Sequence, residues 1–317
     1  MNPIKFGKPP KGSETTKSLQ RLPDWKQSNP KWIKNSLNKA ISKPSGGWHV
    51  IDATESIGTS PCSYWVEGRE LVVWRSGSDI FIAPNACPHL GASLADGHIA
   101  DGNLVCPWHG LHLDCTGHGA WRPIKSYDDG VLLWVQLNGE EALSTSPYLC
   151  RRPENFISAT IRMLAKCEPV DIIANRLDPW HGVHYHPNTF RKLKVIDIDE
   201  EKVTVRVTYK ASNWLNVEVD ARFDCPDPRT IVMTIIDGEG TGSVVETHAT
   251  RMRSGQTSII ETTLVTSERN GFKLISRRPN LVKTLIQKSA KKLWQEDAAY
   301  AERRYALRTG LKDNENN

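Results

Sequence analysis

Two short loops each contain one cysteine closely followed by one histidine, and they constrain how the first half of this chain folds. The first reads Cys87-Pro-His89-Leu-Gly and the second Cys106-Pro-Trp-His109-Gly, with sixteen residues between His89 and Cys106. Each loop offers one thiolate and one imidazole, and two cysteines with two histidines can hold a [2Fe–2S] cluster. A zinc site takes the same residues, but zinc loops more often pair like with like. The mixed pairing therefore favours an iron–sulfur cluster held between two loops.

A second pattern gathers metal-ligating groups in one stretch, Asn175-Arg-Leu-Asp178-Pro-Trp-His181-Gly-Val-His184-Tyr-His186. Two neutral imidazoles with one carboxylate, leaving positions open, are the ligands of a mononuclear non-haem Fe(II) that activates oxygen. His181 and His184 would share a helical face, whereas His186 lies further round the helix. Helical spacing alone therefore favours His184 as the second imidazole. Asp178, followed by proline, also fits the N-cap of a helix.

The third ligand of such an iron is sought on a late helical stretch. From Pro279 to about Thr309, the spacing of apolar residues predicts a helix. One stripe of this helix contains Leu281, Leu285, Leu293, Asp297 and Ala301. A carboxylate on an apolar stripe points inward, which is costly unless it is paired or bound to a metal. Asp297 is therefore the candidate ligand, and Glu296, one position away, is the alternative.

The remaining sequence predicts an α+β protein of two domains. Between Trp48 and Leu137, short apolar runs bounded by turn residues predict a small antiparallel β domain. Later strand-like runs predict an antiparallel sheet with one buried face; they lie at 203–210, 214–223, 230–236, 244–252 and 257–266. We expect a basic arm over 1–46 whose first 30 residues are mobile, a β domain over 47–138, a linker over 139–153, an α+β domain over 154–310 and a polar tail over 311–317.

Positive charge is concentrated in the N-terminal arm. Residues 1–45 hold ten lysines and arginines against two acidic residues, so the rest of the chain is net negative although the overall charge is +5. A basic surface spread over a folded domain, as nucleic-acid binding requires, is therefore not expected. Residues 31–43 carry apolar side chains at helical spacing with lysines between them. This pattern fits a peripheral membrane contact or a helix docked on its own protein.

Cysteine usage and the N-terminal sequence predict a cytoplasmic protein. The seven cysteines are scattered and the first residues form no apolar signal segment, so no disulfide framework is expected. The sequence Gly238-Glu-Gly-Thr-Gly242 fails the spacing of a nucleotide-binding glycine motif, so no nicotinamide or flavin site is expected. Reducing equivalents must then come from a separate ferredoxin or reductase.

The two metal motifs resemble those of the Rieske non-haem iron oxygenases, and the resemblance covers about residues 47–310. It implies a Rieske β domain followed by a catalytic domain of helix-grip (START-like) type, in which an antiparallel sheet wraps a long helix. It implies that the [2Fe–2S] cluster is held by Cys87, His89, Cys106 and His109. It also implies that the mononuclear Fe(II) is held by His181, His186 and Asp297, since the family motif, with an irregular helix end near Gly182 and Pro187, favours His186 over His184.

The resemblance also implies the chemistry. The cluster and Fe(II) supply one electron each to activate O2, and the outcome is hydroxylation, oxidative demethylation or desaturation of an apolar small molecule. The run around His181 looks most like Rieske-type proteins associated with carotenoid biosynthesis, which implies a carotenoid or another isoprenoid as substrate. An electron-transfer Rieske protein without oxygenase activity and a degenerate binding module are the alternatives, and neither needs the mononuclear iron ligands.

Asp178 and Asn175 are the expected catalytic residues beside the iron. In the family, the aspartate that matches Asp178 bridges to a cluster histidine of the neighbouring subunit. The resemblance therefore implies a head-to-tail homotrimer, a closed ring of the kind that heterologous interfaces form.

Overall fold

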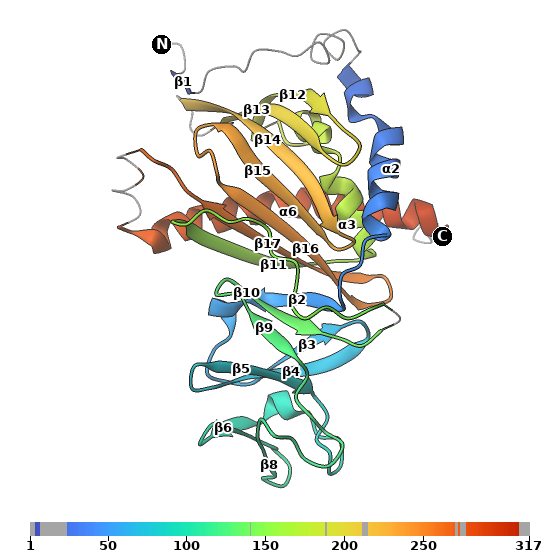
Figure 1. Ribbon diagram of the computed structural model, residues 1–317, viewed down its shortest axis with the longest axis vertical. Coiled ribbons are helices and arrows are strands. Elements are labelled where there is room, and N and C mark those ends of the chain that lie inside the picture. Colours follow the sequence, from blue (N-terminus) through green and yellow to red (C-terminus); the bar gives the residue numbers. More distant parts are fainter. Residues whose placement is uncertain are drawn as a thin grey trace, which may run out of the picture.

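The computed structural model describes residues 4–6, 24–139, 141–187, 189–210, 215–269, 272 and 277–310. A small β unit lies at one end of the molecule, and a large curved sheet with its helices forms the other end (Figure 1). Residues 141–156 carry neither helix nor strand and connect the two parts. The predicted α+β class, with a β domain followed by a sheet around a long C-terminal helix, is confirmed.

The β unit consists of three small antiparallel sheets, in the orders β2-β10-β9, β3-β4-β5 and β6-β7-β8. Its strands are β2 (Trp48–Ala53), β3 (Cys62–Val66), β4 (Arg69–Ser76), β5 (Asp79–Pro84), β6 (His98–Ala100), β7 (Asn103–Val105), β8 (His112–Leu113), β9 (Ser126–Asp128) and β10 (Leu132–Gln136). Short 3-10 turns lie at η2 (Thr54–Ser56) and η3 (Leu94–Asp96).

Strand β4 is buried on both faces and so supports the cluster loops. Leu71 and Val73 pack in one apolar cluster with Leu133 of β10. The alternate residues Val72 and Trp74 pack on the other side, with Cys87, Cys106 and Leu113. Because successive side chains of a strand point to opposite faces, one strand supports both cores. The two loop cysteines thus rest on a rigid hydrophobic base.

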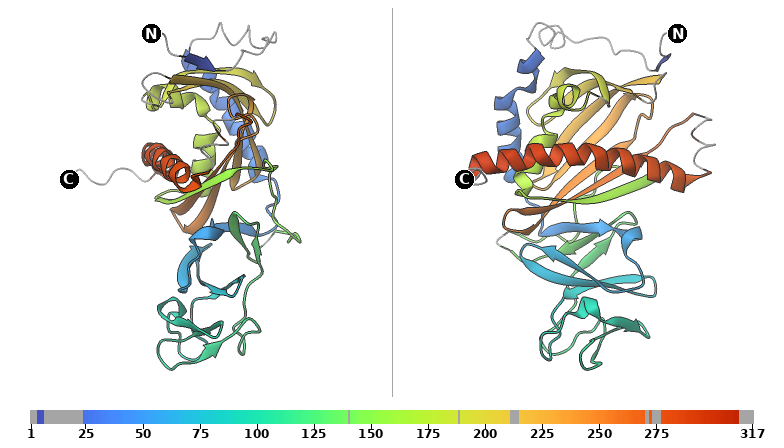
Figure 2. Two further views of the ribbon diagram at one scale, coloured as in Figure 1. Left: turned by 90° about the vertical axis from the view of Figure 1, so that its left-hand side faces the viewer. Right: turned by 180° about the vertical axis from the view of Figure 1, so that it is seen from behind.

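The larger sheet is antiparallel along the order β11-β17-β16-β15-β14-β13-β12, and β1 (Ile4–Phe6) adds to β14 in parallel. Its strands are β11 (Ile157–Ala165), β12 (Phe190–Ile198), β13 (Val203–Lys210), β14 (Leu215–Asp227), β15 (Thr230–Gly238), β16 (Val244–Arg253) and β17 (Gln256–Val265). Helix α6 (Pro279–Thr309) crosses one face of this sheet (Figure 2). The shorter α3 (Pro169–Arg176), η4 (Pro179–His181) and α4 (Gly182–Tyr185) lie between β11 and β12 in the sequence.

Helix α6 is buried only in its middle part, from Ala290 to Ala301. Ala290, Trp294, Asp297 and Ala301 are buried at helical spacing, whereas Leu281 and Leu285 are 57% and 58% exposed. The apolar stripe predicted from the sequence therefore reaches the core only from Ala290 onward. Trp294 and Ala301 pack with α3 residues such as Ile172 and Ile173 in one apolar core.

Residues 31–43 fit one of their two interpretations, a helix docked on its own protein. Helix α2 (Pro30–Ile41) packs Leu37 and Ala40 into the core of the larger domain, and Trp32 Nε1 donates to the carbonyl of Asp199 at 2.6 Å. The short η1 (Asp24–Ser28) precedes it, and the side chain of Gln27 accepts from the backbone of Val195. The apolar side of the helix is thus occupied by its own protein. None of the described helices is long and apolar enough to cross a membrane.

A buried ionic network joins the two parts of the molecule. Arg152, in the connecting segment, pairs with Asp129 of the β unit at 2.9 Å and with Glu246 of β16 at 2.6 Å. Burial by itself would raise the pKa of Glu246, but hydrogen bonds with Arg152 and His248 lower that pKa to about 2. Glu246 is therefore ionised at neutral pH, and its charge holds the connecting segment between the two domains.

Candidate metal centres

The two cluster loops have the same backbone hydrogen bonds. The amide of Cys87 donates to the carbonyl five residues later, and the amide of Gly91 donates back to Cys87. Cys106 and Gly110 repeat both bonds in the second loop. Gly91 and Gly110 have φ values of 78° and 69°, a conformation that favours glycine. The glycine that closes each motif thus allows two equivalent turns.

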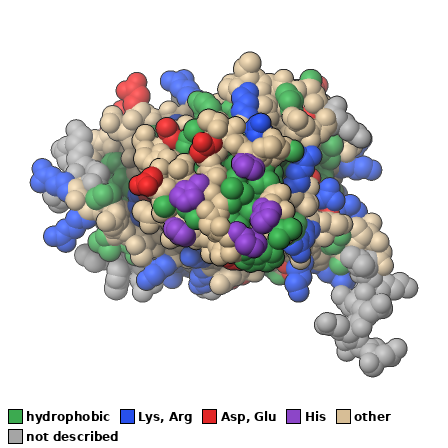
Figure 3. Space-filling model, turned by 90° about the horizontal axis from the view of Figure 1, so that it is seen from below, with side chains coloured by type: hydrophobic (Ala, Val, Ile, Leu, Met, Phe, Trp, Pro, Cys, Tyr) green, Lys and Arg blue, Asp and Glu red, His purple; other side chains and the backbone are tan. Residues whose placement is uncertain are grey.

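The predicted cluster ligands lie together at the tip of the β unit. The thiols of Cys87 and Cys106 are buried within hydrogen-bonding reach of each other. The exposed rings of His89 and His109 are 4.8 Å apart between centroids. Histidines gather around hydrophobic side chains at this end of the molecule (Figure 3). Two buried thiolates for an inner iron and two exposed imidazoles for an outer iron fit a Rieske cluster.

The second centre lies where a helix is repeatedly interrupted. Helix α3 begins with a capping box between Glu168 and Asp171 and ends at Arg176. Pro179 then starts the 3-10 turn that ends at His181, and His186 caps the one-turn helix α4. Because these elements are short and differently directed, the sequence spacing of a regular helix does not apply to the histidines.

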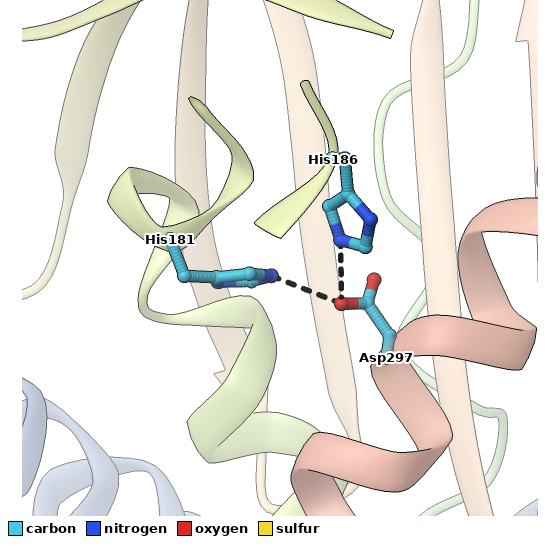
Figure 4. A group of neighbouring side chains, drawn as sticks. All are labelled: His181, His186 and Asp297. Atoms are coloured by element: carbon cyan, nitrogen blue, oxygen red, sulfur yellow. Dashed lines mark hydrogen bonds and ion pairs between the residues drawn. The ribbon is translucent and has the colours of Figure 1, made fainter. Parts of the chain in front are cut away.

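Three side chains converge on one point (Figure 4). Asp297 Oδ1 lies 2.9 Å from His181 Nε2 and 3.0 Å from His186 Nε2. One ligand atom from each residue lies within 4.8 Å of the other two. Asp297 and His186 are each 3% exposed, so a charged group is held in a dry environment. The structure thus brings together the three residues predicted to hold the mononuclear iron.

The hydrogen bonds around these side chains fit a metal. His181 Nδ1 contacts the carbonyl of Asp178, and His186 Nδ1 contacts the carboxylate of Glu296. Each Nδ1 can therefore carry the proton while Nε2 presents its lone pair, as is usual for metal-bound histidines. Burial would raise the pKa of Asp297, but the two imidazoles beside it and the charge of Arg176 hold that pKa well below its usual value. Two imidazoles and an ionised carboxylate are the donor set of non-haem Fe(II).

The alternatives considered from the sequence lie elsewhere. His184 is exposed and packs its ring against Trp180, so its ring does not join the other two. Glu296 faces the distal nitrogen of His186 and thus orients that ring. Asn175 is fully buried and donates its amide to Asp297 Oδ1 at 3.2 Å.

Asp178 is buried next to the triad with one unused oxygen. It precedes the 3-10 turn, and its carboxylate lies next to the backbone amides of Trp180 and His181 in that turn. Oδ1 has no hydrogen-bond partner among the described residues, and burial raises the pKa of the carboxyl group. Sequence reasoning missed Tyr300, which hydrogen-bonds Asp178 and stacks on His181 at 5.3 Å. Its position three residues after Asp297, on the same helical face, was the available signal.

A cavity of about 370 Å³ opens beside the triad. Its walls are mainly apolar side chains from β12 to β16 and from α6, including Phe190, Val207, Phe223, Ile286 and Leu293. The triad lies in the wall, so a molecule in the cavity would contact the iron site directly. Arg176 and Glu261 also line the cavity and were not singled out from the sequence.

Family models cover both parts of the chain. A model described as a domain of unknown function (DUF5914) matches residues 138–312, more than half of the chain, and a Rieske [2Fe–2S] domain model matches residues 47–130. The chain belongs to the DUF5914 family and to the Rieske non-haem iron oxygenases. The predicted cofactors, a [2Fe–2S] cluster and a mononuclear Fe(II), are those of the Rieske oxygenases.

Curated relatives of this Rieske oxygenase include oxygenase subunits. It is 26% identical to the vanillate O-demethylase oxygenase subunit of Pseudomonas sp. (strain HR199 / DSM 7063), over 52% of this chain and 50% of the relative. It is 25% identical to the chloroplastic protein TIC 55 of Pisum sativum, over 61% of this chain and 40% of the relative. The chain thus spans half or less of the length of these relatives.

Solved structures share the fold of this Rieske oxygenase. Dicamba monooxygenase bound to dicamba aligns with a TM-score of 0.64 at 17% identity, covering 85% of this chain and 90% of that chain. The terminal oxygenase of carbazole 1,9a-dioxygenase from Nocardioides aromaticivorans IC177 aligns with a TM-score of 0.56 at 12% identity, covering 91% and 92%. The likeness extends over both domains, and it concerns the fold alone.

Proposed function

We propose that this Rieske oxygenase activates O2 at the mononuclear centre and oxidises an apolar molecule bound in the adjacent cavity. The cluster and Fe(II), when bound, supply one electron each for this activation. The observation that carries the proposal is the convergence of His181, His186 and Asp297 in the wall of a cavity of about 370 Å³. An electron-transfer Rieske protein, the alternative function, needs neither these ligands nor a cavity.

The chain's own groups would hold the site ready for this reaction. The Asp178 carbonyl and the Glu296 carboxylate fix the two imidazole rings, and the Asn175 amide fixes Asp297. Apolar walls exclude water from the bound substrate, which protects reactive species and strengthens polar contacts inside the cavity. Hydroxylation, oxidative demethylation or desaturation would follow, according to which carbon of the substrate faces the iron.

An isoprenoid or carotenoid substrate agrees with the apolar walls. A molecule longer than the cavity would leave it past Leu285, which lines the cavity and is 58% exposed. Leu281 is 57% exposed one helical turn further along α6 and would extend the apolar contact. Electrons would come from a separate ferredoxin or reductase docking at the cluster tip, where Leu90 and Trp108 are 63% and 62% exposed.

Assembly into a head-to-tail homotrimer would complete the electron path. The cluster loops lie in the β unit, whereas the mononuclear site is formed by elements of the other domain, including α6 (Figure 1). A neighbouring subunit in a closed ring could bring its cluster next to this iron site. The free Oδ1 of Asp178 would then accept a hydrogen bond from a cluster imidazole of that subunit.

The iron content tests the proposal. Protein purified without oxygen should hold about three irons per chain, two in the cluster and one mononuclear. Cys87→Ser should remove the visible absorption of the cluster, whereas His181→Ala, His186→Ala or Asp297→Ala should keep the colour and lose the third iron. His184→Ala is the matched control and should keep all the iron. Two irons per chain in the anaerobically purified and iron-supplied protein would favour the electron-transfer alternative.

Glu296→Gln separates the two carboxylates of α6. The amide can still hydrogen-bond His186 but lacks the charge, so we expect iron affinity to fall by about tenfold without complete loss. If Glu296→Gln loses the third iron completely and Asp297→Ala retains it, then Glu296 is the iron ligand and Asp297 is not.

A cytoplasmic location with a peripheral membrane contact through residues 31–43 is also proposed. Since Leu37 and Ala40 are buried, the contact would use the lysines of α2 and the basic residues before it. Replacing Lys31 and Lys34 by glutamate should reduce sedimentation with anionic vesicles at low salt and leave both metals bound. Equal sedimentation of the two proteins would remove this contact from the proposal.

A further inference from the structure

The wall of the cavity contains one ion pair in addition to the iron ligands. Arg176 Nη2 and Glu261 Oε2 are 3.4 Å apart, and both residues line the cavity. Arg176 follows Asn175, which donates to Asp297, and its positive charge contributes to the low pKa of Asp297. The ion pair therefore belongs to the iron end of an otherwise mainly apolar cavity.

The guanidinium group of Arg176 is held in place but is poorly supplied with acceptors. It lies over the rings of Phe223 and Trp294, at 6.0 Å and 5.6 Å from their centroids. Its Nε is buried and has no hydrogen-bond partner among the described residues. A guanidinium has several N–H donors, and buried donors without acceptors destabilise a site. The Arg176 side chain lines the cavity and is 19% exposed, so an oxygen atom of a bound molecule can accept from a guanidinium N–H that faces the cavity.

Glu261 determines which kind of oxygen can bind there. Its carboxylate also accepts from Thr247 Oγ1 at 3.1 Å, and the residue is 7% exposed. Since Glu261 already neutralises Arg176, a carboxylate on the substrate would lie beside a second buried negative charge. Like charges repel strongly where water is excluded. A neutral hydroxyl or carbonyl oxygen meets no such repulsion.

We propose that Arg176 and Glu261 form a polar subsite that selects a neutral alcohol, aldehyde or ketone over both a hydrocarbon and a carboxylic acid. This inference deepens the proposed function by naming the substrate class, and it rests on that function only in taking this cavity as the substrate site. The oxygen of the substrate accepts from Arg176 at the iron end, and the hydrocarbon part lies against the apolar walls. Tyr209 also lines the cavity, and burial raises the pKa of its phenol to about 12, so it remains a neutral group.

Two matched series of compounds test the selection. The first has one isoprenoid skeleton, as farnesene, farnesol, farnesal and farnesoic acid; the second has one aromatic skeleton, as naphthalene, 2-naphthol, 2-naphthaldehyde and 2-naphthoic acid. Binding to the metal-loaded protein is measured by calorimetry at pH 7.5 without oxygen, so turnover is not required. In at least one series, we expect the alcohol or aldehyde to bind at least about tenfold more tightly than both the hydrocarbon and the acid. A site built to hydrogen-bond an oxygen binds an analogue without that oxygen more weakly, because its buried polar groups are left unpaired.

Two substitutions then change the selection in opposite ways. Glu261→Gln keeps the shape and an acceptor for Thr247 but leaves the charge of Arg176 uncompensated. The acid should then bind about tenfold more tightly than it does to the wild-type protein, and the hydrocarbon should be unaffected. Arg176→Met removes the donors, so the preference over the hydrocarbon should disappear. Met233→Leu, a neutral change in the same cavity, is the control and should alter the affinities within a series by a common factor.

Unchanged visible absorption and melting temperature identify variants that have kept their fold. Equal affinities within both series, a wild-type preference for the hydrocarbon or acid, or binding of none of the compounds would overturn the proposal. An unaltered acid affinity in folded Glu261→Gln would also overturn it. These outcomes are independent of the iron count. If the cavity is selective but the protein holds no third iron, the polar subsite stands and the oxygenase function is wrong. If the third iron is present but the cavity is not selective, the oxygenase function stands and the polar subsite is wrong.

Discussion

Asp178 combines burial with a carboxylate oxygen that no described residue contacts by a hydrogen bond. Its Oδ1 has no hydrogen-bond partner among the described residues, and the carbonyl of the same residue orients His181. Asp178→Asn keeps the size of the side chain but replaces an acceptor-only group by one that also donates. We expect a folded protein with both metals and a reducible cluster, and turnover reduced by about 100-fold or more.

The control for this prediction is Asp178→Ser, which keeps the ability to cap the 3-10 turn. If the serine variant is active while the asparagine variant unfolds, Asp178 is a capping residue and carries no electron-transfer role. Reduction of the cluster by dithionite and iron analysis separate a loss of electron transfer from a loss of metal.

At the same scale, the sequence reveals residues that lie close together in a motif and misses those that meet only in the fold. Cys87 and His89 are recognisable because one loop sets their spacing. Asp297 could be found only as a charge on an apolar stripe. Tyr300 had one local signal, its position three residues after Asp297 in the same helix. The pairing of Arg176 with Glu261 had none, because these two residues lie on distant elements.

Helix α6 carries Asp297, helix α3 carries Asn175, which donates to Asp297, and Asp171 joins these two helices. Asp171 is fully buried in α3 and forms ion pairs with Arg304 and Arg308 of α6, the latter at 2.8 Å. Asp171→Asn removes the charge that both arginines share. We expect the free energy of unfolding to fall by about 1–3 kcal/mol, since hydrogen bonds between charged groups are lost. The third iron should also dissociate faster.

Urea unfolding and iron release into a chelator measure the two effects. Arg308→Met leaves Arg304 in place and should have the smaller effect on both. Iron release at the wild-type rate in a destabilised Asp171→Asn would mean that the helix pair is not what positions Asp297.

At the scale of elements, five strands of the larger sheet and α6 could be predicted from the sequence, whereas β11, β12 and the extent of burial of α6 could not. The strand-like runs at 230–236, 244–252 and 257–266 correspond to β15, β16 and β17 within two residues at each end. Leu281 and Leu285 belong to the expected stripe but are exposed, because only the later part of α6 packs on α3. A periodic pattern predicts a helix and one apolar face, but the neighbouring elements decide how much of that face is covered.

At the scale of the whole molecule, the ionic network around Glu246 joins the two domains, and its contribution to the stability of the folded protein should depend on pH. The pKa of Glu246 is about 2 in the folded protein against an ordinary value of 4.5. A lowered pKa stabilises the folded state above pH 4.5, and this contribution is lost as the pH falls from about 4.5 toward 2. At neutral pH it amounts to roughly 3 kcal/mol at most.

Glu246→Gln should therefore be less stable than the wild-type protein at pH 7, and the difference should shrink below about pH 4.5. Urea unfolding of both proteins at each pH measures the difference in their free energies of unfolding. Both proteins lose the cluster in acid, so that loss does not contribute to the difference. A difference that stays constant down to pH 3 would show that the charge of Glu246 does not contribute.

The separation of the two metal sites within one chain has a consequence for mixtures of inactive proteins. Cys87→Ser lacks a cluster but keeps an iron site, and Asp297→Ala lacks the iron but keeps a cluster. Suppose that each iron in the ring receives electrons from the cluster of the next subunit. Assembling rings from equal amounts of the two variants then places some intact iron sites next to intact clusters. Random mixing leaves one chain in two with an iron site, and half of these beside an intact cluster, so about a quarter of the wild-type turnover per chain should return. A mixture as inactive as its parents would mean that each chain conducts electrons only within itself. Complementation thus makes the direction of electron flow between subunits visible without a structure of the assembly.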